Sequence, residues 1–594
     1  GWYGKHGRGY ILEETRHEKM VVALSMAKAF GTGGGIFVFP NEDLCEKVLN
    51  CGGPFMFSGP HQIPVIGASL ASAKILLSDE LPQLQDVLKQ NINYCHALLE
   101  SKGLPVVSSP NTPIFFIGLG LVRVGNNLVK KIIDDGFYVN VSAFPAVPET
   151  CTGIRFTITC HHTFEDIERL VEALAYHFPR VLEEEGRTIN DIIRAFRRIK
   201  DFKDTLLRYN PIHSKDNLYT VQYEKSITNI PQKLWNRLIP KNSFDWKGLC
   251  LLEEVFTNNP DQENNWNFHY YIVRDQNNYP VAATLFTSVI TKDDMLASAE
   301  VSKKIEQLRE KNKYHMTSEM LLMGTMLSEG QHLFIDRERT DWRKGLMLLL
   351  DTIWKEQDLI NAGIINLRDF DPEDTELCEF FKEQGFIMTP LPETHIIENI
   401  PWETNEEFLS QLSADKRYYV KKKAIQFEHL YEVKVIRFPS EEQIDIYYEL
   451  YKNVADKSYE IAGFTLPKKL FMDLALSKEW EFIELSIKPE YDTRQNLLPV
   501  GISINCFSNE KYNFLLTGMD YAFLESHNLY AQILWQIVKR ANMLHARQTL
   551  LGLTASQNKR KFGAHSVPSV GFVQVKDHIN LLLMDLISSE KIKK

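Results

Sequence analysis

The chain has 594 residues, of which 44% are hydrophobic and 24% are charged; this globular composition excludes disordered, collagen-like and low-complexity classes. Its 67 basic and 77 acidic side chains give a formal charge of −10, which argues against a dedicated nucleic-acid-binding protein. No apolar run approaches the roughly 18 residues of a membrane span. At roughly 100–200 residues per domain, we expect about three to five domains.

Compartment and metal binding can be judged from the cysteines and the N-terminus. The eight cysteines are sparse and lack paired C-x-x-C spacing, which favours reduced, mostly buried thiols over a disulfide or zinc framework. The first residues lack the basic and apolar regions of a signal peptide. We therefore expect a cytoplasmic protein without a metal site.

Residues 1–180 alternate strand and helix signals, which is typical of an α/β layer fold. Thr163 followed by Asp166 is a helix start. In chain order, the expected elements are a strand at 36–39 after a glycine-rich loop, one or two long helices over 62–102, strands at 114–117 and 155–158, and a helix over 164–177.

Residues 181–215 change character and are interpreted as a helical linker. The acidic run Glu183-Glu184-Glu185 is followed by the basic residues Arg194, Arg197, Arg198 and Lys200. A solvated helix face accounts for this charge.

Residues 216–594 contain two similar units, each with a strand, a helix and a second strand. The expected order is 332–336, 343–360 and 363–368 in the first unit, and 512–516, 527–545 and 549–553 in the second. We interpret this recurrence as an internal duplication. Alternating apolar residues over 482–515 predict sheet hairpins.

Lys28 lies in a glycine-rich loop after a strand signal, with Ser25 three residues before it and Gly31, Gly33, Gly34 and Gly35 after it. A partly desolvated lysine can condense with an aldehyde, as in enzymes that hold pyridoxal phosphate. The Ser25 hydroxyl can bind a phosphate, and glycines allow close approach of the backbone. Taken alone, this pattern is also compatible with a surface lysine.

Further motifs flank Lys28 in a fixed order. They are Gly4-Lys5-His6-Gly7-Arg8-Gly9, Phe55-Met56-Phe57-Ser58-Gly59-Pro60, Phe144-Pro145-Ala146-Val147-Pro148, Gly153-Ile154-Arg155-Phe156 and His161-His162-Thr163. This order and spacing resemble the α-oxoamine synthase family of fold-type I pyridoxal phosphate enzymes, which includes 8-amino-7-oxononanoate synthase and serine palmitoyltransferase. The resemblance covers about residues 1–180.

The resemblance implies a role for four residues. Lys28 would form the internal aldimine with pyridoxal 5′-phosphate and move protons, while Ser25 would contact the phosphate. Ser58 would contact the phosphate of a neighbouring subunit, which implies a homodimer. Arg155 would bind the carboxylate of the amino-acid substrate; the alternatives are a turn hydroxyl for Ser58 and a surface charge for Arg155. His162 is expected to shape a turn.

The family reaction is the decarboxylative condensation of an amino acid with an acyl thioester, carried by coenzyme A or an acyl carrier protein. The family's Asp at the pyridine nitrogen and its His that stacks on the ring precede the motif of Lys28, and neither is present in the given sequence. We therefore expect that this chain alone is not a competent synthase, and that about 200 further residues precede Gly1.

The second half is compatible with an acyltransferase of the GNAT type, and more closely resembles duplicated Fem-type peptidyl transferases. The usual phosphate-binding glycines are poorly matched by Arg343-Lys344-Gly345. A basic cluster (Lys416, Arg417, Lys421, Lys422 and Lys423) is either a site for a phosphate-bearing donor or a solvated helix face. Asp520 and Tyr530 are candidate cleft residues, with structural roles as the alternative.

These observations predict five regions: the remainder of a cofactor-binding large domain (1–105), its small C-terminal domain (106–180), the linker (181–215) and two GNAT-like domains (216–400 and 401–594). The expected function is an α-oxoamine synthase fused to an N-acyltransferase, in lipid or secondary-metabolite biosynthesis. The alternative is a non-catalytic scaffold or acyl-CoA-binding module.

Overall fold

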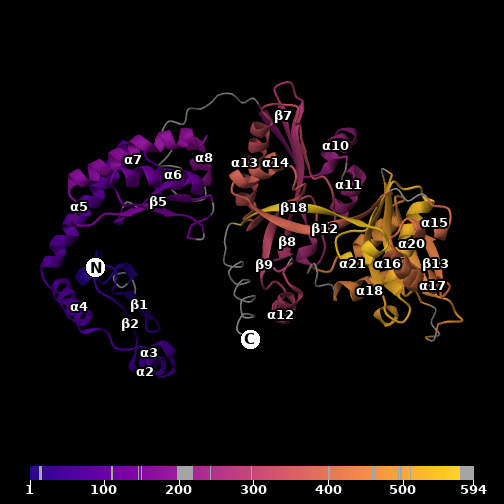
Figure 1. Ribbon diagram of the computed structural model, residues 1–594, viewed down its shortest axis with the longest axis horizontal. Coiled ribbons are helices and arrows are strands. Elements are labelled where there is room, and N and C mark those ends of the chain that lie inside the picture. The colour runs from indigo at the N-terminus through magenta and orange to yellow at the C-terminus, as the bar shows by residue number, and fades with distance from the viewer. Residues whose placement is uncertain are drawn as a thin grey trace. The chain divides into compact units, whose positions relative to one another are not determined.

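The fold is described from a computed structural model of the chain (Figure 1). The described residues are 1–11, 17–108, 111–144, 146–148, 150–196, 219–240, 243–295, 297–398, 402–457, 463–492, 494, 498–508 and 510–575. The chain divides into two compact units, Gly1–His213 and Ser214–Lys594, and each is described by itself. Among the helices in the described ranges, none combines the length and the apolar character needed to cross a membrane.

The first unit has a two-stranded antiparallel hairpin, β1–β2, and a three-stranded antiparallel sheet in the order β3-β5-β4. Its elements are η1 (Lys5–Gly7), β1 (Val22–Ser25), β2 (Gly35–Val38), α2 (Glu42–Cys51), α3 (Gly53–Phe57), α4 (Ile63–Leu76), α5 (Glu80–Ser101), β3 (Ile114–Gly120), α6 (Val122–Asp134), β4 (Asn140–Ser142), β5 (Thr152–Thr157), α7 (Phe164–Glu184) and α8 (Ile189–Ala195).

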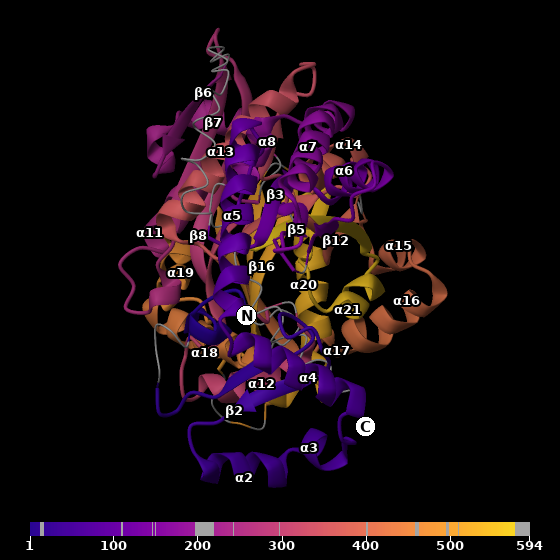
Figure 2. The same cartoon turned by 90° about the vertical axis from the view of Figure 1, so that its left-hand side faces the viewer.

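Helix α7 shows how the sequence determines one of these elements. Thr163 Oγ1 accepts from the Asp166 backbone N–H at 3.2 Å, and the Asp166 carboxylate accepts from the Thr163 N–H at 2.9 Å, which completes the predicted capping box. Apolar residues at helical spacing, including Ile167, Leu170 and Leu174, are buried. Helices α6 and α7 pack together over the three-stranded sheet (Figure 2).

The core of the first unit lies around this sheet, and it includes residues of the expected linker. Helix α7 continues to Glu184, and Ile192 and Phe196 are buried in the same core. The expected linker, 181–215, therefore begins within the folded unit. Arg197, Arg198 and Lys200 lie outside the described residues.

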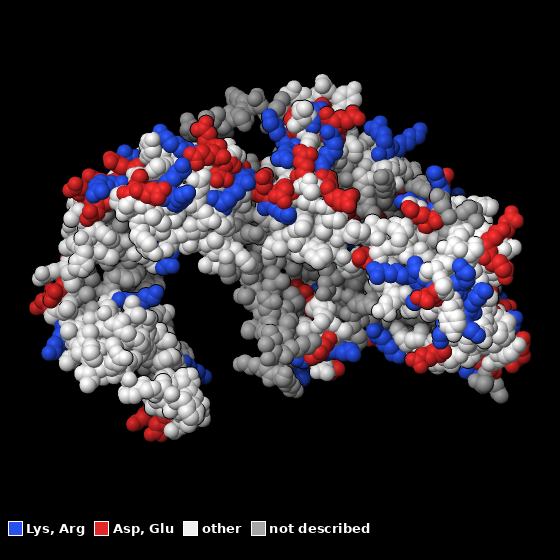
Figure 3. Space-filling view, viewed as in Figure 1, with Lys and Arg blue, Asp and Glu red and all other residues white. Residues whose placement is uncertain are grey.

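Residues 1–80 differ from the rest of the first unit, because none of their described side chains is buried. Several large apolar side chains on the hairpin and on α3 and α4 are exposed, including Phe37, Phe57 and Ile63. In the face shown in Figure 3, this part carries few charges, whereas acidic and basic residues alternate over α5 to α7.

The second unit contains one mixed sheet of 13 strands. The elements of its first half are β6 (Tyr219–Glu224), η2 (Ile227–Asn229), α10 (Gln232–Leu238), α11 (Trp246–Val255), η3 (Gln262–Asn264), β7 (Asn267–Asp275), β8 (Pro280–Lys292), α12 (Ala299–Arg309), β9 (Thr317–Met323), β10 (Leu333–Ile335), α13 (Trp342–Ile360), β11 (Ile364–Phe370), α14 (Thr375–Glu383) and β12 (Ile387–Glu398).

The second half of this unit repeats much of that order. Its elements are α15 (Asn405–Ser410), α16 (Ala414–Tyr419), η4 (Val420–Ile425), α17 (Gln426–Glu428), β13 (Tyr431–Ile436), α18 (Glu441–Ala455), α19 (Lys468–Leu476), β14 (Trp480–Ile487), β15 (Gly501–Ser508), β16 (Lys511–Met519), η5 (Tyr521–Phe523), α20 (Leu529–Met543), β17 (Gln548–Leu550), α21 (Ser556–Lys561) and β18 (His565–Val575).

The strand order is symmetric about the centre of the sheet. It reads β6-β7-β8-β9-β11 from one edge and β13-β14-β15-β16-β17 from the other, with β18 and β12 between them. The pairs β9–β11 and β16–β17 are parallel, as expected for strands joined through a crossover helix. The repeat in strand order supports the internal duplication inferred from the sequence.

The last strand of each half lies beside the opposite half. Strand β18 pairs with β11 of the first half, and β12 pairs with β17 of the second half. The two exchanged strands also pair with each other in antiparallel register, for example Met388 opposite Phe572. One buried cluster contains residues of both halves, such as Leu252 and Leu474. The halves therefore share a sheet and a core.

One predicted correspondence between the halves is wrong. The run 332–336 does contain a strand, β10, but β10 pairs with β8 in antiparallel register at the side of the main strand path. The first-half counterpart of β16 is β9. Each of these two strands pairs in parallel with the strand that follows the long helix of its own half.

Candidate functional site

Lys28 lies in the loop that joins β1 to β2. Three backbone hydrogen bonds close the loop: Met26 N–H to Gly34 O, Thr32 N–H to Met26 O, and Gly31 N–H to Lys28 O, at 2.9–3.0 Å. Gly31 and Gly34 have φ values of 66° and 88°, a conformation that glycine adopts without a steric penalty. The glycines therefore determine the tight path that presents Lys28.

Helix α4 supports this loop from one side. Ser72 Oγ donates to Phe30 O at 2.6 Å, and Ser69 Oγ donates to Thr32 Oγ1 at 3.2 Å. The His61 ring, just before α4, fills the space beside Gly34, because a Cβ at Gly34 would lie 2.1 Å from His61 Cε1. A side chain at this position would displace the ring or the loop.

The sequence-predicted cofactor residues Ser25, Lys28 and Ser58 are all exposed. Ser25 is the last residue of β1 and shares the hairpin with Lys28, whereas Ser58 follows the end of α3. Helix α3 packs on the hairpin, since the rings of Phe55 and Phe37 lie 5.6 Å apart between centroids. Across the described residues, no hydrogen bond joins Ser58 to Ser25 or Lys28.

The side chains of the hairpin are chemically suited to bind an aldehyde that carries a phosphate. The hairpin presents an exposed amine and a hydroxyl, Lys28 and Ser25, on a loop whose glycines admit close approach. Because Gly34 has no Cβ, the His61 ring can lie next to that loop. An amine that forms a covalent bond with an aldehyde and a hydroxyl that binds phosphate are two of the groups that a pyridoxal phosphate site requires.

Arg155 belongs to the other sheet of the first unit. It lies on β5 opposite Asn140 and Phe116 and is exposed. Together with residues of β4 and α7 it lines a pocket of about 900 Å³. His162 lies in the same lining, where its Nδ1 accepts from the Thr159 N–H at 3.0 Å. His162 therefore shapes the turn before α7, as expected.

The second unit contains a cavity of about 300 Å³ beside the parallel pair β16–β17. These strands pair only from Lys511 to Asn513, opposite Gln548 to Leu550. The pairing includes all of β17, which ends at Leu550, while β16 continues to Met519 and carries a bulge at Leu515, between the pairs Ile504–Leu516 and Asn505–Phe514. The cavity is lined by the segments 514–517 and 551–554, by Tyr451, Val454 and Ala455 of α18, and by Met326, Leu327, Glu329, Gly463, Phe464, Leu466, Tyr530 and Lys559.

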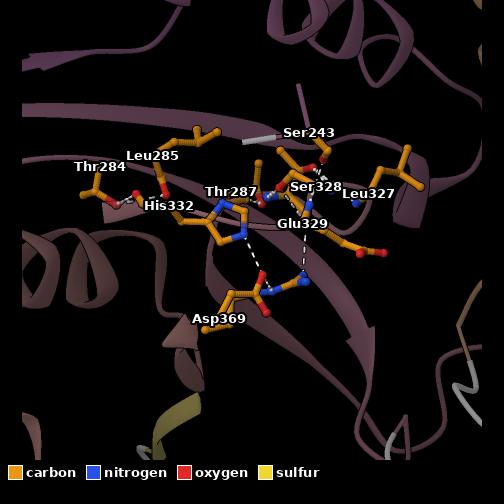
Figure 4. Close-up of polar contacts among 12 residues, drawn as sticks. Ser243, Thr284, Leu285, Thr287, Leu327, Ser328, Glu329, His332 and Asp369 are labelled. Carbon is orange, nitrogen blue, oxygen red and sulfur yellow. Dashed lines mark hydrogen bonds and ion pairs between the residues drawn. The ribbon is translucent and has the colours of Figure 1, made fainter. Parts of the chain in front are cut away.

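A polar network lies next to this cavity around Glu329 (Figure 4). The Glu329 backbone is held by Ser243, which exchanges two hydrogen bonds of 2.8 and 2.9 Å with it. Arg368 donates to Thr325 O at 3.2 Å and to the Asp369 carboxylate at 3.1 Å, and His332 Nε2 lies 2.8 Å from the same carboxylate. Asp369 has φ 66°, a strained conformation for a non-glycine residue.

The electrostatics of this network follow from burial. Burial raises the pKa of Glu329, an effect that Arg368 and Lys559 reduce and Asp369 reinforces. Burial also lowers the pKa of His332, partly offset by Asp369. For Asp369, burial acts to raise the pKa, but Arg368 and His332 outweigh it and the net direction is downward. The network therefore favours a neutral His332 beside an ionised Asp369.

Other residues suggested by the sequence have structural partners. Arg343 at the start of α13 pairs with Glu376 at 3.3 Å. Arg417 donates to the carbonyls of Leu409 and Leu412, and Asp520 accepts from the Ala522 N–H. In the part of the chain that the structure describes, no three His, Cys, Asp or Glu side chains are grouped as metal ligands.

Comparison with known proteins defines the class of the first unit. Residues 2–174 match the family Aminotransferase class I and II. This region is therefore of the fold-type I transferase class, and pyridoxal 5′-phosphate, predicted from the sequence, is confirmed as the cofactor of that class. The match covers less than a third of the chain and does not extend to the second unit.

The relatives carry the names 5-aminolevulinate synthase and 8-amino-7-oxononanoate synthase. The chain is 30% identical over 197 residues to an erythroid-specific mitochondrial 5-aminolevulinate synthase of Opsanus tau, covering 32% of each protein. It is 28% identical over 185 residues to a protein of Desulforudis audaxviator described as a putative 8-amino-7-oxononanoate synthase, covering 31% of this chain and 46% of that one. The chain thus spans less than half the length of these relatives.

A solved structure described as SPT with a PLP internal aldimine shares 22% sequence identity with the chain. The similarity covers 27% of this chain and 40% of that one, with a TM-score of 0.26.

Proposed function

We propose that residues 1–180 provide the lysine-bearing part of a pyridoxal phosphate-dependent α-oxoamine synthase. The reaction is the decarboxylative condensation of an amino acid with an acyl thioester of coenzyme A or an acyl carrier protein. The observation that carries this proposal is the position of Lys28: an exposed amine on a glycine loop, inside a region that matches the aminotransferase class I and II family. The 5-aminolevulinate and 8-amino-7-oxononanoate synthase relatives support the reaction class.

Four residues would bind the cofactor and the substrate, and one of them would also transfer a proton. When bound, pyridoxal phosphate supplies the electron sink for a carbanion at the substrate α-carbon. Lys28 Nζ holds the cofactor and takes up or returns a proton, while the Ser25 hydroxyl donates to the phosphate. In the proposed homodimer, Ser58 donates to the phosphate bound by the neighbouring subunit. Arg155 binds the substrate carboxylate through two parallel hydrogen bonds. We place this enzyme in the cytoplasm.

For the second unit we propose a GNAT-like acyltransferase that acts on an amine. Support comes from the short pairing of β16 with β17, because backbone groups of β16 that follow Asn513 and no longer pair with β17 can bind an extended chain such as that of an acyl thioester. The bulge at Leu515 and the adjacent cavity lie just after the last paired residue. Together the two units would serve lipid or secondary-metabolite biosynthesis.

A non-catalytic scaffold or acyl-CoA-binding module is the second candidate. One observation favours it: at the start of α13, the Asp341 carboxylate accepts from Tyr219 and Arg339. An acidic side chain at this helix N-terminus opposes the binding of a phosphate.

Borohydride reduction tests the synthase proposal. The full chain is incubated with pyridoxal phosphate, reduced, digested and mapped by mass spectrometry. We expect a stable pyridoxyl group on Lys28, lost in Lys28→Ala and retained in Lys74→Ala, which removes an exposed lysine of α4. Labelling spread evenly over surface lysines, or absent from Lys28, would refute the assignment.

Titration with acyl-CoA tests the proposal for the second unit. Octanoyl-CoA is expected to bind the full chain, and Ala455→Trp, which fills the cavity from the end of α18, should weaken binding at least tenfold. Ala455→Ser is the matched control and should bind like the unmodified chain. Equal binding by all three proteins would place the acyl-CoA elsewhere. Binding without transfer to any amine would favour the acyl-CoA-binding module.

A further inference from the structure

The pocket around Arg155 carries more positive charge than the proposed function uses. Among the described residues that line it, the charged side chains are Arg155 on β5 and Asp166 and Arg169 on α7. His162 also lines the pocket, but its Nδ1 accepts from the Thr159 N–H, as a neutral ring does. The proposed function gives Arg155 the α-carboxylate of the amino-acid substrate, and it gives Arg169 no role.

Neither arginine of this pocket forms a salt bridge within the described residues. Asp166 Oδ2 instead accepts from the Thr163 N–H at 2.9 Å and from the Thr163 hydroxyl at 2.8 Å. These hydrogen bonds, with smaller contributions from His162 and Arg169, hold the pKa of Asp166 below its usual value. Asp166 is therefore ionised, but its hydrogen bonds go to the start of α7. Both guanidinium groups can thus bind anionic groups of a ligand.

An aromatic ring orients the second arginine. The Arg169 guanidinium carbon lies over the ring of Phe137, 5.7 Å from the ring centroid, and Phe137 is itself part of the pocket lining. A guanidinium above an aromatic face keeps the N–H groups in its own plane free to donate. Because the contact already restricts the side chain, less conformational entropy is lost when a ligand binds.

Apolar side chains form another part of the lining. Phe156, Ile158, Ile167 and Leu170 belong to it, and each of them is at most 8% exposed. The pocket volume of about 900 Å³ corresponds to about 30 water molecules, which is far more than one carboxylate occupies. The pocket therefore suits a ligand in which an aliphatic segment joins two anionic groups.

We propose that this pocket binds an α-amino acid whose aliphatic side chain ends in a second carboxylate. Arg155 binds the α-carboxylate, and Arg169 binds the side-chain carboxylate through two parallel hydrogen bonds. The apolar lining contacts the methylene groups. The inference rests on the proposed synthase function for the role of Arg155, and it deepens that function by naming its substrate class, an acidic amino acid.

Pairs of acid and amide probes test the second carboxylate. L-Glutamate is compared with L-glutamine, and L-2-aminoadipate with its side-chain amide, which extends the comparison by one methylene group. Each probe is titrated calorimetrically into the full chain, Arg155→Gln, Arg169→Gln and Arg180→Gln. Arg180 is the matched control, because it is an exposed arginine of α7 that also lies over an aromatic ring, Tyr176, but is not part of the lining. Circular dichroism confirms that each variant is folded.

The expected pattern differs between the two pocket arginines. At one chain length at least, the full chain should bind the acid at least tenfold more tightly than its amide. Arg169→Gln should weaken binding of that acid to the level of the amide and leave the amide within twofold. Arg155→Gln should weaken the acid and the amide alike, and Arg180→Gln should change neither.

Three results would overturn the proposal: no binding of any acid by the folded full chain, equal affinity for acid and amide at both chain lengths, or equal loss of acid and amide in Arg169→Gln. The N-acetylcysteamine thioesters of glutarate and pentanoate test the acyl group as the other source of a second carboxylate. If Arg169→Gln weakens only the glutarate thioester, the carboxylate belongs to the acyl group and the amino-acid assignment is wrong.

Failure of the synthase function is a separate result. It would show as absent labelling of Lys28 by pyridoxal phosphate while the full chain still prefers the acid to the amide through Arg169. Conversely, specific labelling of Lys28 together with an unchanged preference in Arg169→Gln would refute only the acidic substrate class.

Discussion

Glu329 is a residue whose environment conflicts with its own charge. Its carboxylate faces a mainly apolar cavity, and burial raises its pKa despite the cations Arg368 and Lys559. A group with a folded-state pKa above its unfolded value favours folding most at acid pH, and this contribution is lost as the pH rises through the folded-state pKa. At neutral pH the ionised Glu329 therefore reduces the stability of the fold.

Glu329→Gln should consequently stabilise the protein at neutral and mildly alkaline pH. We expect a higher free energy of unfolding at pH 8, because the amide carries no charge that has to be buried in the folded state. At pH 4, where the carboxyl group is largely protonated, the difference should shrink towards zero. Urea denaturation at the two pH values measures both quantities.

The exposed residue Glu338 provides the matched control. Glu338→Gln should change stability by less than about 0.5 kcal/mol at either pH. A Glu329→Gln variant that is less stable than the unmodified protein at pH 8 would show that the carboxylate makes net favourable contacts there. A more stable variant would indicate that the carboxylate is not retained for folding.

The sequence predicts Lys28 as a candidate site residue and gives no signal for Glu329, for a physical reason. Lys28 depends on a local pattern, because the serine, the lysine and the glycines that shape its loop lie within eleven residues. Glu329 depends on distant partners: Ser243, Arg368 and Lys559 come from three separate parts of the chain. An isolated glutamate in a polar loop carries no signal of such contacts.

Individual elements follow the sequence where local interactions determine them. The capping box of Thr163 and Asp166 begins α7 as expected, and the apolar runs at 114–117 and 363–368 are strands. The pairing of strands is harder to predict from sequence, because an apolar run before a helix does not show which strand it will pair with. For this reason the sequence pattern predicts that 332–336 corresponds to 512–516, although β9 holds the corresponding place in the sheet.

The exchange of β12 and β18 could not be predicted from local pattern either. Each strand contains some apolar residues among polar ones, and that pattern is compatible with pairing inside its own half. Only long-range packing decides between the two arrangements. Phe572 of β18 packs its ring 5.6 Å from Phe370 and 5.0 Å from Phe381, both in the first half.

At the scale of the second unit, this exchange predicts that the two halves unfold together. Phe572 is fully buried, and Phe572→Ala should lower the free energy of unfolding by about 3–5 kcal/mol. Because β18 pairs with β11 on one side and β12 on the other, and β12 pairs with β17, the loss should reach both halves. Hydrogen exchange should therefore show reduced protection in β9 and β11 as well as in β16 and β17.

Phe507→Ala on β15 is the control, because this phenylalanine is exposed and its loss should leave protection unchanged in both halves. Two autonomous domains would behave differently: a variant near the C-terminus would lose protection in one half and retain it in the other. Reduced protection in both halves would show that the cavity between the Glu329 loop and α21 is formed only when the whole sheet is folded, since its two charges come from opposite halves. Ligand binding at that cavity would then stabilise the entire unit by mass action.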